Sequence, residues 1–101
     1  MVQKIPARSA YTLARRSSLM SQFHAVKEQY KDYILLFQVG DFYELYGKDA
    51  ELVTEKTTLR VTQKQGVLMA GFPVRSLNEW LKVLVEAGFQ LAICNQARKE
   101  G

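Results

Sequence analysis

Apolar positions divide the first half of the chain into a helical segment and a strand. Between residues 18 and 31 they recur at three- and four-residue spacing behind Ser18, a suitable N-cap, and so predict a helix. The apolar positions of this helix are Leu19, Phe23, Val26 and Tyr30. Residues 33 to 39 are almost continuously apolar and end at Gly40. This run is too short for a second helix and predicts a central strand covered on both faces.

The second half of the chain predicts two more helices and three strands. Residues 44–55 place apolar and charged side chains on opposite faces of a helix, with Tyr46, Ala50 and Val53 on the apolar face. Segments 57–63 and 67–72 have strand composition and flank a turn at 64–66. The last helix begins with a capping box, Ser76 to Glu79, and ends before Gly88, and a strand follows over 89–94.

These elements predict an α/β fold in which helices flank a mixed β-sheet. The chain has 101 residues, of which 48% are hydrophobic, so it can bury the core of one compact domain. The order helix, strand, helix, two strands, helix, strand requires a sheet with both parallel and antiparallel neighbours. We therefore expect a single domain over residues 18–101.

The net charge of +4 comes from the N-terminal segment. Residues 18–101 contain ten basic and ten acidic side chains, whereas the four basic residues before them, Lys4, Arg8, Arg15 and Arg16, have no acidic counterpart. We expect residues 1–17 to be a flexible basic tail, which could contact phosphates, resemble a mitochondrial presequence, or only solubilise the chain. Without a membrane-length apolar segment, we expect a soluble intracellular protein of the cytoplasm or nucleoid, with a mitochondrial location left open.

Few residues in the chain indicate catalysis. His24, the single histidine, has no cysteine or carboxylate at ligand spacing and is expected to be a surface or helix-packing residue. Cys94 is the single cysteine and lies in an apolar strand, where a core role is favoured over a reactive thiol. The scattered glycines of the chain form no phosphate-binding loop, so we expect no enzyme, metal or cofactor.

The stretch "GDFYELY" at 40–46 has two interpretations. Phe42 and Glu44 share a face only if the backbone is extended there, because residues two apart on a helix point in nearly opposite directions. An aromatic wedge could then stack at a base step while the carboxylate tests the edge of a displaced base. Alternatively, Asp41 caps a helix with Glu44 at its third position, which makes Phe42 a packed first-turn residue.

Three separated blocks resemble the N-terminal mismatch-recognition domain, domain I, of the MutS family of DNA mismatch-repair proteins. They are "LMSQFHAVKEQYKDY" at 19–33, "LLFQVGDFYELYGKDAEL" at 35–52 and "LMAGFPVRSLNEWLKVLVEAGFQLAICNQ" at 68–96. The resemblance implies a mixed α/β sheet whose Phe-X-Glu motif enters the minor groove at a mispair. Phe42 would stack on the mispaired base and Glu44 would hydrogen-bond to it, with Tyr43 between them.

The resemblance also implies which partners and surfaces to expect. The partner would be double-stranded DNA with a mismatch or small loop, together with other domains or subunits of a MutS-type protein. ATP and magnesium would be needed only by the ATPase domain of full-length relatives. Expected contacts to the DNA backbone come from the Val39 region with Gln38 and from the loop "MAGFP" at 69–73, which begins at Met69. We also expect phosphate contacts from the basic side chains Arg60, Lys64 and Arg75. The alternative is a structural or protein-interaction module that keeps the fold without sensing mismatches.

Overall fold

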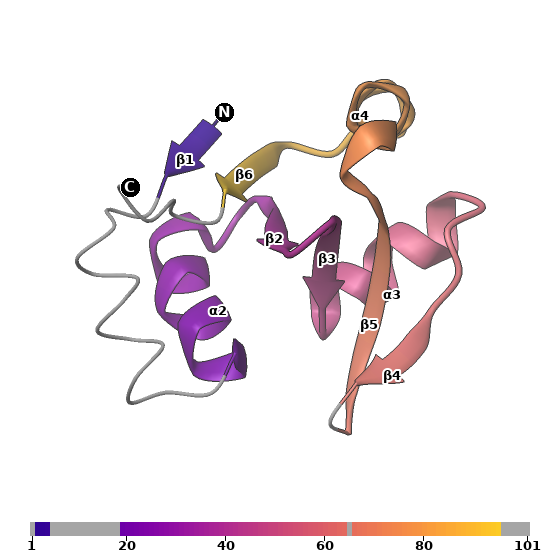
Figure 1. Cartoon of the computed structure of the whole chain (residues 1–101). Helices are drawn as coiled ribbons and strands as arrows, with labels where there is room; N and C mark the ends of the chain where they lie inside the picture. Colours follow the sequence, from indigo (N-terminus) through magenta and orange to yellow (C-terminus); the bar gives the residue numbers. More distant parts are fainter. Residues whose placement is uncertain (1, 5–18, 65, 96–101) are drawn as a thin grey trace.

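The computed structural model describes residues 2–4, 19–64 and 66–95, which form a mixed β-sheet with helices on both faces (Figure 1). Its six strands lie in the order β1-β6-β2-β3-β5-β4. The strands are β1 (Val2–Lys4), β2 (Ile34–Val39), β3 (Phe42–Tyr46), β4 (Thr62–Lys64), β5 (Val67–Pro73) and β6 (Leu91–Asn95). The helices are α2 (Leu19–Lys27), α3 (Lys48–Lys56) and α4 (Leu77–Glu86), with 3₁₀ turns η1 (Glu28–Tyr30) and η2 (Val74–Ser76). The predicted α/β fold with a mixed sheet is confirmed.

Strand β2 is the central strand that its apolar run predicts. It pairs in parallel with β6 and antiparallel with β3, and Leu35 and Leu36 are both fully buried. Successive side chains of a strand point to opposite faces, so Leu35 and Leu36 belong to two different cores. Both faces of β2 are therefore covered, as a continuous apolar strand requires.

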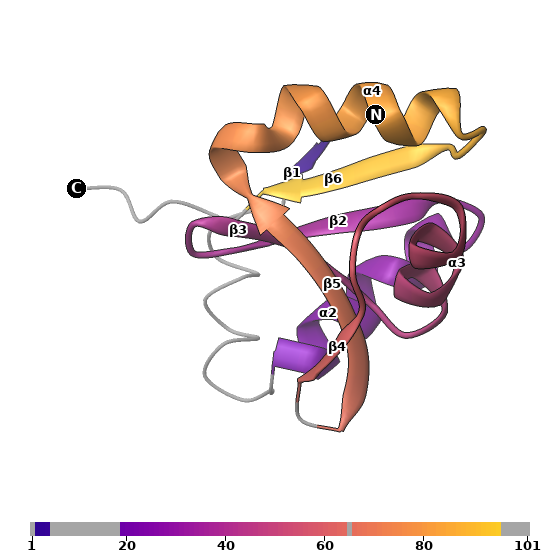
Figure 2. The same ribbon diagram turned by 90° about the vertical axis from the view of Figure 1, so that its right-hand side faces the viewer.

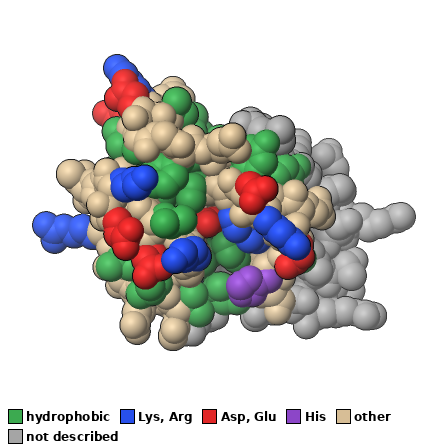
Figure 3. Space-filling view, turned by 180° about the vertical axis from the view of Figure 1, so that it is seen from behind, with side chains coloured by type: hydrophobic (Ala, Val, Ile, Leu, Met, Phe, Trp, Pro, Cys, Tyr) green, Lys and Arg blue, Asp and Glu red, His purple; other side chains and the backbone are tan. Residues whose placement is uncertain are grey.

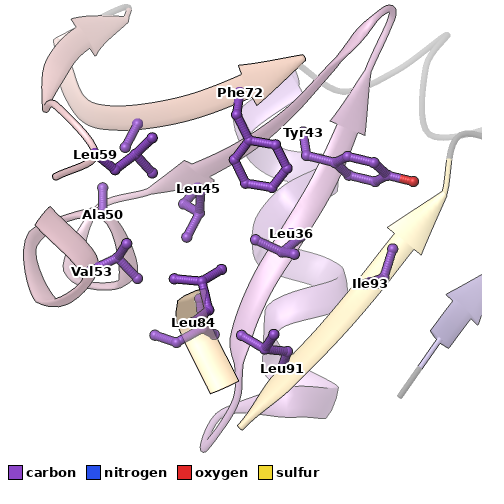
Figure 4. Close-up of a cluster of buried hydrophobic side chains, with 12 residues drawn as sticks. Leu36, Tyr43, Leu45, Ala50, Val53, Leu59, Phe72, Leu84, Leu91 and Ile93 are labelled. Atoms are coloured by element: carbon purple, nitrogen blue, oxygen red, sulfur yellow. The ribbon is translucent and has the colours of Figure 1, made fainter. Parts of the chain in front are cut away.

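Two buried clusters hold the helices against the sheet. On one face, Phe23 and Val26 of α2 pack with Leu35 and Tyr46. On the other face, α3 and α4 share a larger cluster, which Figure 4 shows in close-up. Its buried members are Ile34, Leu36, Tyr43, Leu45, Ala50, Val53, Leu59, Ala70, Phe72, Leu84, Leu91 and Ile93. No helix in the described ranges is long and apolar enough to cross a membrane.

Helix α4 ends as predicted but begins differently. Gly88 has φ of 96°, its N–H donates to the Val85 carbonyl at 3.0 Å, and the Phe89 N–H donates to the Leu84 carbonyl at 3.1 Å. These two bonds form a Schellman motif, in which glycine adopts the left-handed conformation at low cost. The predicted capping box is wrong, because the Ser76 side chain makes no cap hydrogen bond and a 3₁₀ turn leads into the helix instead.

Three predicted elements have different bounds in the structure. The helix predicted from residue 44 begins only at Lys48, because residues 44–46 belong to β3. Gly47, with φ of 61°, changes the direction of the backbone between β3 and α3. Of the predicted strand 57–63, only Thr62 and Gln63 are in β4. Within the predicted tail 1–17, Val2–Lys4 pair with β6 as β1, and residues 5–17 lie outside the described ranges.

A buried ion pair links α2, β2 and α3. Asp49, which is 4% exposed, accepts the Leu35 N–H at 3.0 Å and pairs with the Lys27 ammonium at 3.0 Å. Lys27 also donates to the Tyr33 carbonyl. Strand β3 pairs with β2 only as far as Phe37 opposite Glu44, so the Asp49 carboxylate occupies the place of a missing strand partner beside Leu35.

Candidate functional site

A tight hairpin joins β2 to β3 and projects from one end of the sheet (Figure 2). Val39 pairs with Phe42, which leaves a two-residue loop of Gly40 and Asp41. Gly40 has φ of 60°, as the first loop position of a mirror-image hairpin turn requires. The Asp41 carbonyl accepts the Val74 N–H at 2.8 Å, so the start of η2 supports the hairpin tip.

Strand β3 places Phe42 and Glu44 on the same face of the sheet. The backbone from Phe42 to Tyr46 is extended, which confirms the extended conformation predicted for 42–44. The alternative, in which Asp41 caps a helix and Phe42 packs in its first turn, is wrong. The Phe42 side chain is 48% exposed and is the first residue of the strand. An exposed aromatic residue at the end of a strand that is paired on both sides is available to contact a ligand.

Glu44 lies two residues further along and is mostly buried. Only 7% of the residue is exposed, and its carboxylate accepts hydrogen bonds from the Tyr46 hydroxyl and from the Lys64 ammonium, the latter at 2.9 Å. Burial and the neighbouring Glu44 carboxylate both raise the pKa of Tyr46, so its hydroxyl remains a donor at neutral pH. Lys64, expected at the DNA backbone, is therefore paired with Glu44 within the protein.

Gly71 of β5 lies opposite Glu44 and allows the two strands to approach closely. A Cβ atom added at this position would lie 2.8 Å from the Tyr43 carbonyl oxygen and 3.4 Å from Cγ of Glu44. The first distance is shorter than any ordinary carbon–oxygen contact, so a side chain at position 71 requires the backbones of β3 and β5 to separate.

We expect Gly71→Ala to lower the free energy of unfolding by about 1–3 kcal/mol, the usual cost of inserting a methyl group where there is no room. Chemical denaturation measures this change. Thr62→Ala on the neighbouring strand β4 is the control, because Thr62 is exposed and its replacement should change stability by less than about 0.5 kcal/mol. Equal stability of the two variants would contradict the steric argument.

Tyr43 lies on the opposite face of β3 from Phe42 and Glu44. It is 5% exposed, its ring packs near Phe72 as Figure 4 shows, and its hydroxyl donates to Oδ1 of Asn95 at 2.7 Å. Burial raises the pKa of this phenol. The structure therefore does not bring Tyr43 to the face that carries the other two residues of the motif.

The remaining predicted DNA-contact residues are spread along the sheet. Val39 is half-buried beside Phe42, whereas Gln38 donates its side-chain N–H to the Gly40 carbonyl at 3.2 Å. Met69 packs against the cluster around α2 and belongs to β5, so the segment expected to be a loop at 69–73 is a strand. Arg75 is exposed in η2 and follows Val74, whose N–H bonds the hairpin tip. Arg60 is exposed between α3 and β4.

His24 and Cys94 occupy the positions expected of them. His24 is exposed on α2, and its ring contacts Phe23 edge to face at 5.5 Å. Cys94 is 1% exposed, and burial raises the pKa of its thiol to about 11. The core role predicted for Cys94 is confirmed.

The family model described as MutS domain I matches residues 17–101. The chain belongs to the MutS domain I family. Proteins named DNA mismatch repair protein MutS are 51% identical to it over 78 residues in Thermotoga petrophila and 44% over 84 residues in Thermosipho melanesiensis. These matches cover 77% and 83% of the chain, respectively, and 10% of each relative.

The chain thus spans about a tenth of the length of these MutS relatives. A third relative, from Thermotoga neapolitana, is 49% identical over 82 residues, which is 81% of the chain and 10% of that protein. All three organisms are bacteria, so the comparisons give no support to a mitochondrial location.

Three residues of this region were not predicted from the sequence. Tyr46 was assigned to a helix although it continues the two-residue alternation of Phe42 and Glu44 along β3. Gly71 approaches β3 closely, and Asn95 accepts the Tyr43 hydroxyl. The alternation was the one available signal, because the other two contacts join residues that are far apart in the sequence.

Proposed function

We propose that this chain binds mismatched or unpaired bases in double-stranded DNA by inserting Phe42 into the minor groove, as part of mismatch repair. The observation that carries the proposal is that Phe42 is about half exposed on an extended strand paired on both sides, on the same face as Glu44. Membership of the MutS domain I family supports it, since the relatives are named DNA mismatch repair proteins.

The physics of wedging supports selectivity for mispairs. Inserting an apolar side chain between base steps costs a few kcal/mol of unstacking and kinks the duplex. A mispair is already weakly stacked and flexible, so the same insertion costs less there than in matched DNA. Glu44 adds a penalty against a base that offers only acceptors, because a carboxylate oxygen is compensated only by a base that offers a donor.

The charge of the folded part predicts weak binding by this chain alone. Residues 18–101 have ten basic and ten acidic side chains, so counterion release contributes little. On the face seen in Figure 3, the described Lys and Arg side chains are interspersed with Asp and Glu side chains. Exposed Arg75 follows Val74, which bonds the hairpin tip, and is a cation that could reach a phosphate beside the hairpin. Arg60 is also exposed, between α3 and β4.

We further infer that the chain acts without a cofactor and is not itself an enzyme. The relatives are about ten times longer than the matched segment, so other domains or subunits of a MutS-type protein would supply ATP hydrolysis and most of the contacts with DNA.

The second candidate function is a structural or protein-interaction module without mismatch sensing. One observation favours it, the burial of Glu44 against Tyr46 and Lys64.

A paired titration separates the two functions. Fluorescently labelled duplexes that differ only by one mispair are titrated with the chain at low salt, with anisotropy as the measurement. The proposed function predicts tighter binding to the mismatched duplex, and the preference should persist when salt weakens both complexes. Equal affinity for the two duplexes would refute mismatch recognition by this chain and favour the structural module.

A further inference from the structure

We propose that Tyr46 and Lys64 are positioning residues that hold one oxygen of Glu44 and leave the other as the acceptor offered to a base. This inference rests on the proposed function and adds two residues to the recognition of the mispair. It also assigns Lys64 a role different from a contact with the DNA backbone.

Both donors reach the same carboxylate oxygen. The Tyr46 hydroxyl and the Lys64 ammonium each donate to Oε1 of Glu44, the latter at 2.9 Å. Oε2 accepts from neither of them. A carboxylate has room for about four hydrogen bonds, so Oε2 retains its acceptor capacity. Because 10% of the Glu44 side chain is exposed, the group is not sealed from a ligand.

The two donors come from different parts of the fold. Tyr46 is 1% exposed, and its ring packs edge to face against Phe23 of α2 at 5.0 Å. Lys64 reaches Glu44 from β4, and its side chain is 31% exposed. Gly71 lies opposite Glu44 and leaves room for Cγ of Glu44. The carboxylate is therefore fixed from two sides by parts of the fold that do not depend on DNA.

The arrangement also changes the electrostatic cost of bringing a carboxylate to DNA. Paired with the Lys64 ammonium, Glu44 presents little net charge to the phosphates, yet still offers a lone pair on Oε2. A base with a donor at its edge can bond to this oxygen, whereas a base that presents only acceptors is repelled. Glu44 can therefore still discriminate between bases by their donors and acceptors, while its repulsion from the DNA phosphates is reduced.

The test is a double-mutant cycle on the 101-residue chain, with the ratio of affinities for mismatched and matched duplex as the measurement. We expect Lys64→Met and Tyr46→Phe each to lower this ratio by about threefold to tenfold, the effect of losing one hydrogen bond of typical net strength. Lys64→Arg should retain the ratio. In a Glu44→Gln background, Lys64→Met should change it by less than about twofold, because its effect passes through Glu44.

Lys82→Met is the matched control, since Lys82 is exposed on α4 and distant in sequence from the hairpin. An unchanged ratio in both Lys64→Met and Tyr46→Phe would overturn the inference. The inference would also be overturned if Lys64→Met weakened binding to both duplexes equally, in either background. A phosphate contact would have this effect, and it would also reduce the slope of log affinity against log salt concentration by about 0.9. A wild-type ratio of one would instead refute the proposed function, and with it this inference.

Discussion

Phe42→Ala is expected to abolish most of the preference for a mispair while the domain stays folded. An aromatic side chain stacked on a base contributes about 1–3 kcal/mol, so the affinity for mismatched duplex should fall about 5- to 150-fold. The affinity for matched duplex should change little, because the ring has no weakened step to enter there. The fold should tolerate the change because Phe42 is 48% exposed at the start of β3.

Anisotropy titrations with the two duplexes measure this effect, and circular dichroism checks the fold. Val85→Ala is the matched control, since Val85 is an apolar residue of α4 with 60% exposure. It should leave both affinities unchanged. If Phe42→Ala bound mismatched DNA as tightly as the wild type, the Phe42 ring would not take part in recognition of the mispair.

The largest effect on stability is expected from Asp49→Ala. The substitution leaves the Leu35 N–H without its acceptor and the Lys27 ammonium without its carboxylate. Removing one partner of a buried ion pair costs about 3–5 kcal/mol, and the partial exposure of Lys27 places the expected loss at about 3 kcal/mol. For a domain of this size, that loss lowers the melting temperature by more than about 10 °C.

Thermal and chemical denaturation measure this loss. Glu51→Ala on the same helix is the control, because the pair of Glu51 with Lys48 at 3.3 Å is exposed and should contribute less than about 0.5 kcal/mol. Asp49→Asn should fall between the two, since an amide oxygen can still accept from Leu35. Equal melting temperatures for Asp49→Ala and Glu51→Ala would contradict a structural role for the buried pair.

The parts of the fold that were predicted correctly are those with strong local patterns. The apolar run of β2 has no competing helical interpretation, and Gly88 marks the end of α4 through its own backbone conformation. The extended backbone at Phe42 and Glu44 followed from their spacing. In each case the deciding information lies within a few neighbouring residues.

The boundary between β3 and α3 was missed because two patterns overlap there. Tyr46, Ala50 and Val53 are spaced as on one helix face, yet Tyr46 belongs to the strand and packs on the opposite side of the sheet from the other two. Gly47, with φ of 61°, redirects the chain between them. A single sequence does not reveal which pattern prevails, since the choice is made by packing on both faces of the sheet.

The environment of Glu44 was missed for a different reason. Its partner Lys64 is 20 residues away in the sequence, and their strands, β3 and β4, come to lie on either side of β5 only in the folded sheet. The same applies to Asp49 and Leu35, which are separated by 14 residues. Contacts of this kind follow from strand order and register, which residue spacing does not encode.

Magnetic resonance of the chain with its phenylalanine rings isotopically labelled tests the central claim most directly. On addition of a duplex with one mispair, we predict upfield shifts of the Phe42 ring protons and nuclear Overhauser contacts from this ring to the mispaired base. The matched duplex should produce neither. Phe42 resonances that stay at their free positions while the mispaired duplex binds would contradict the account.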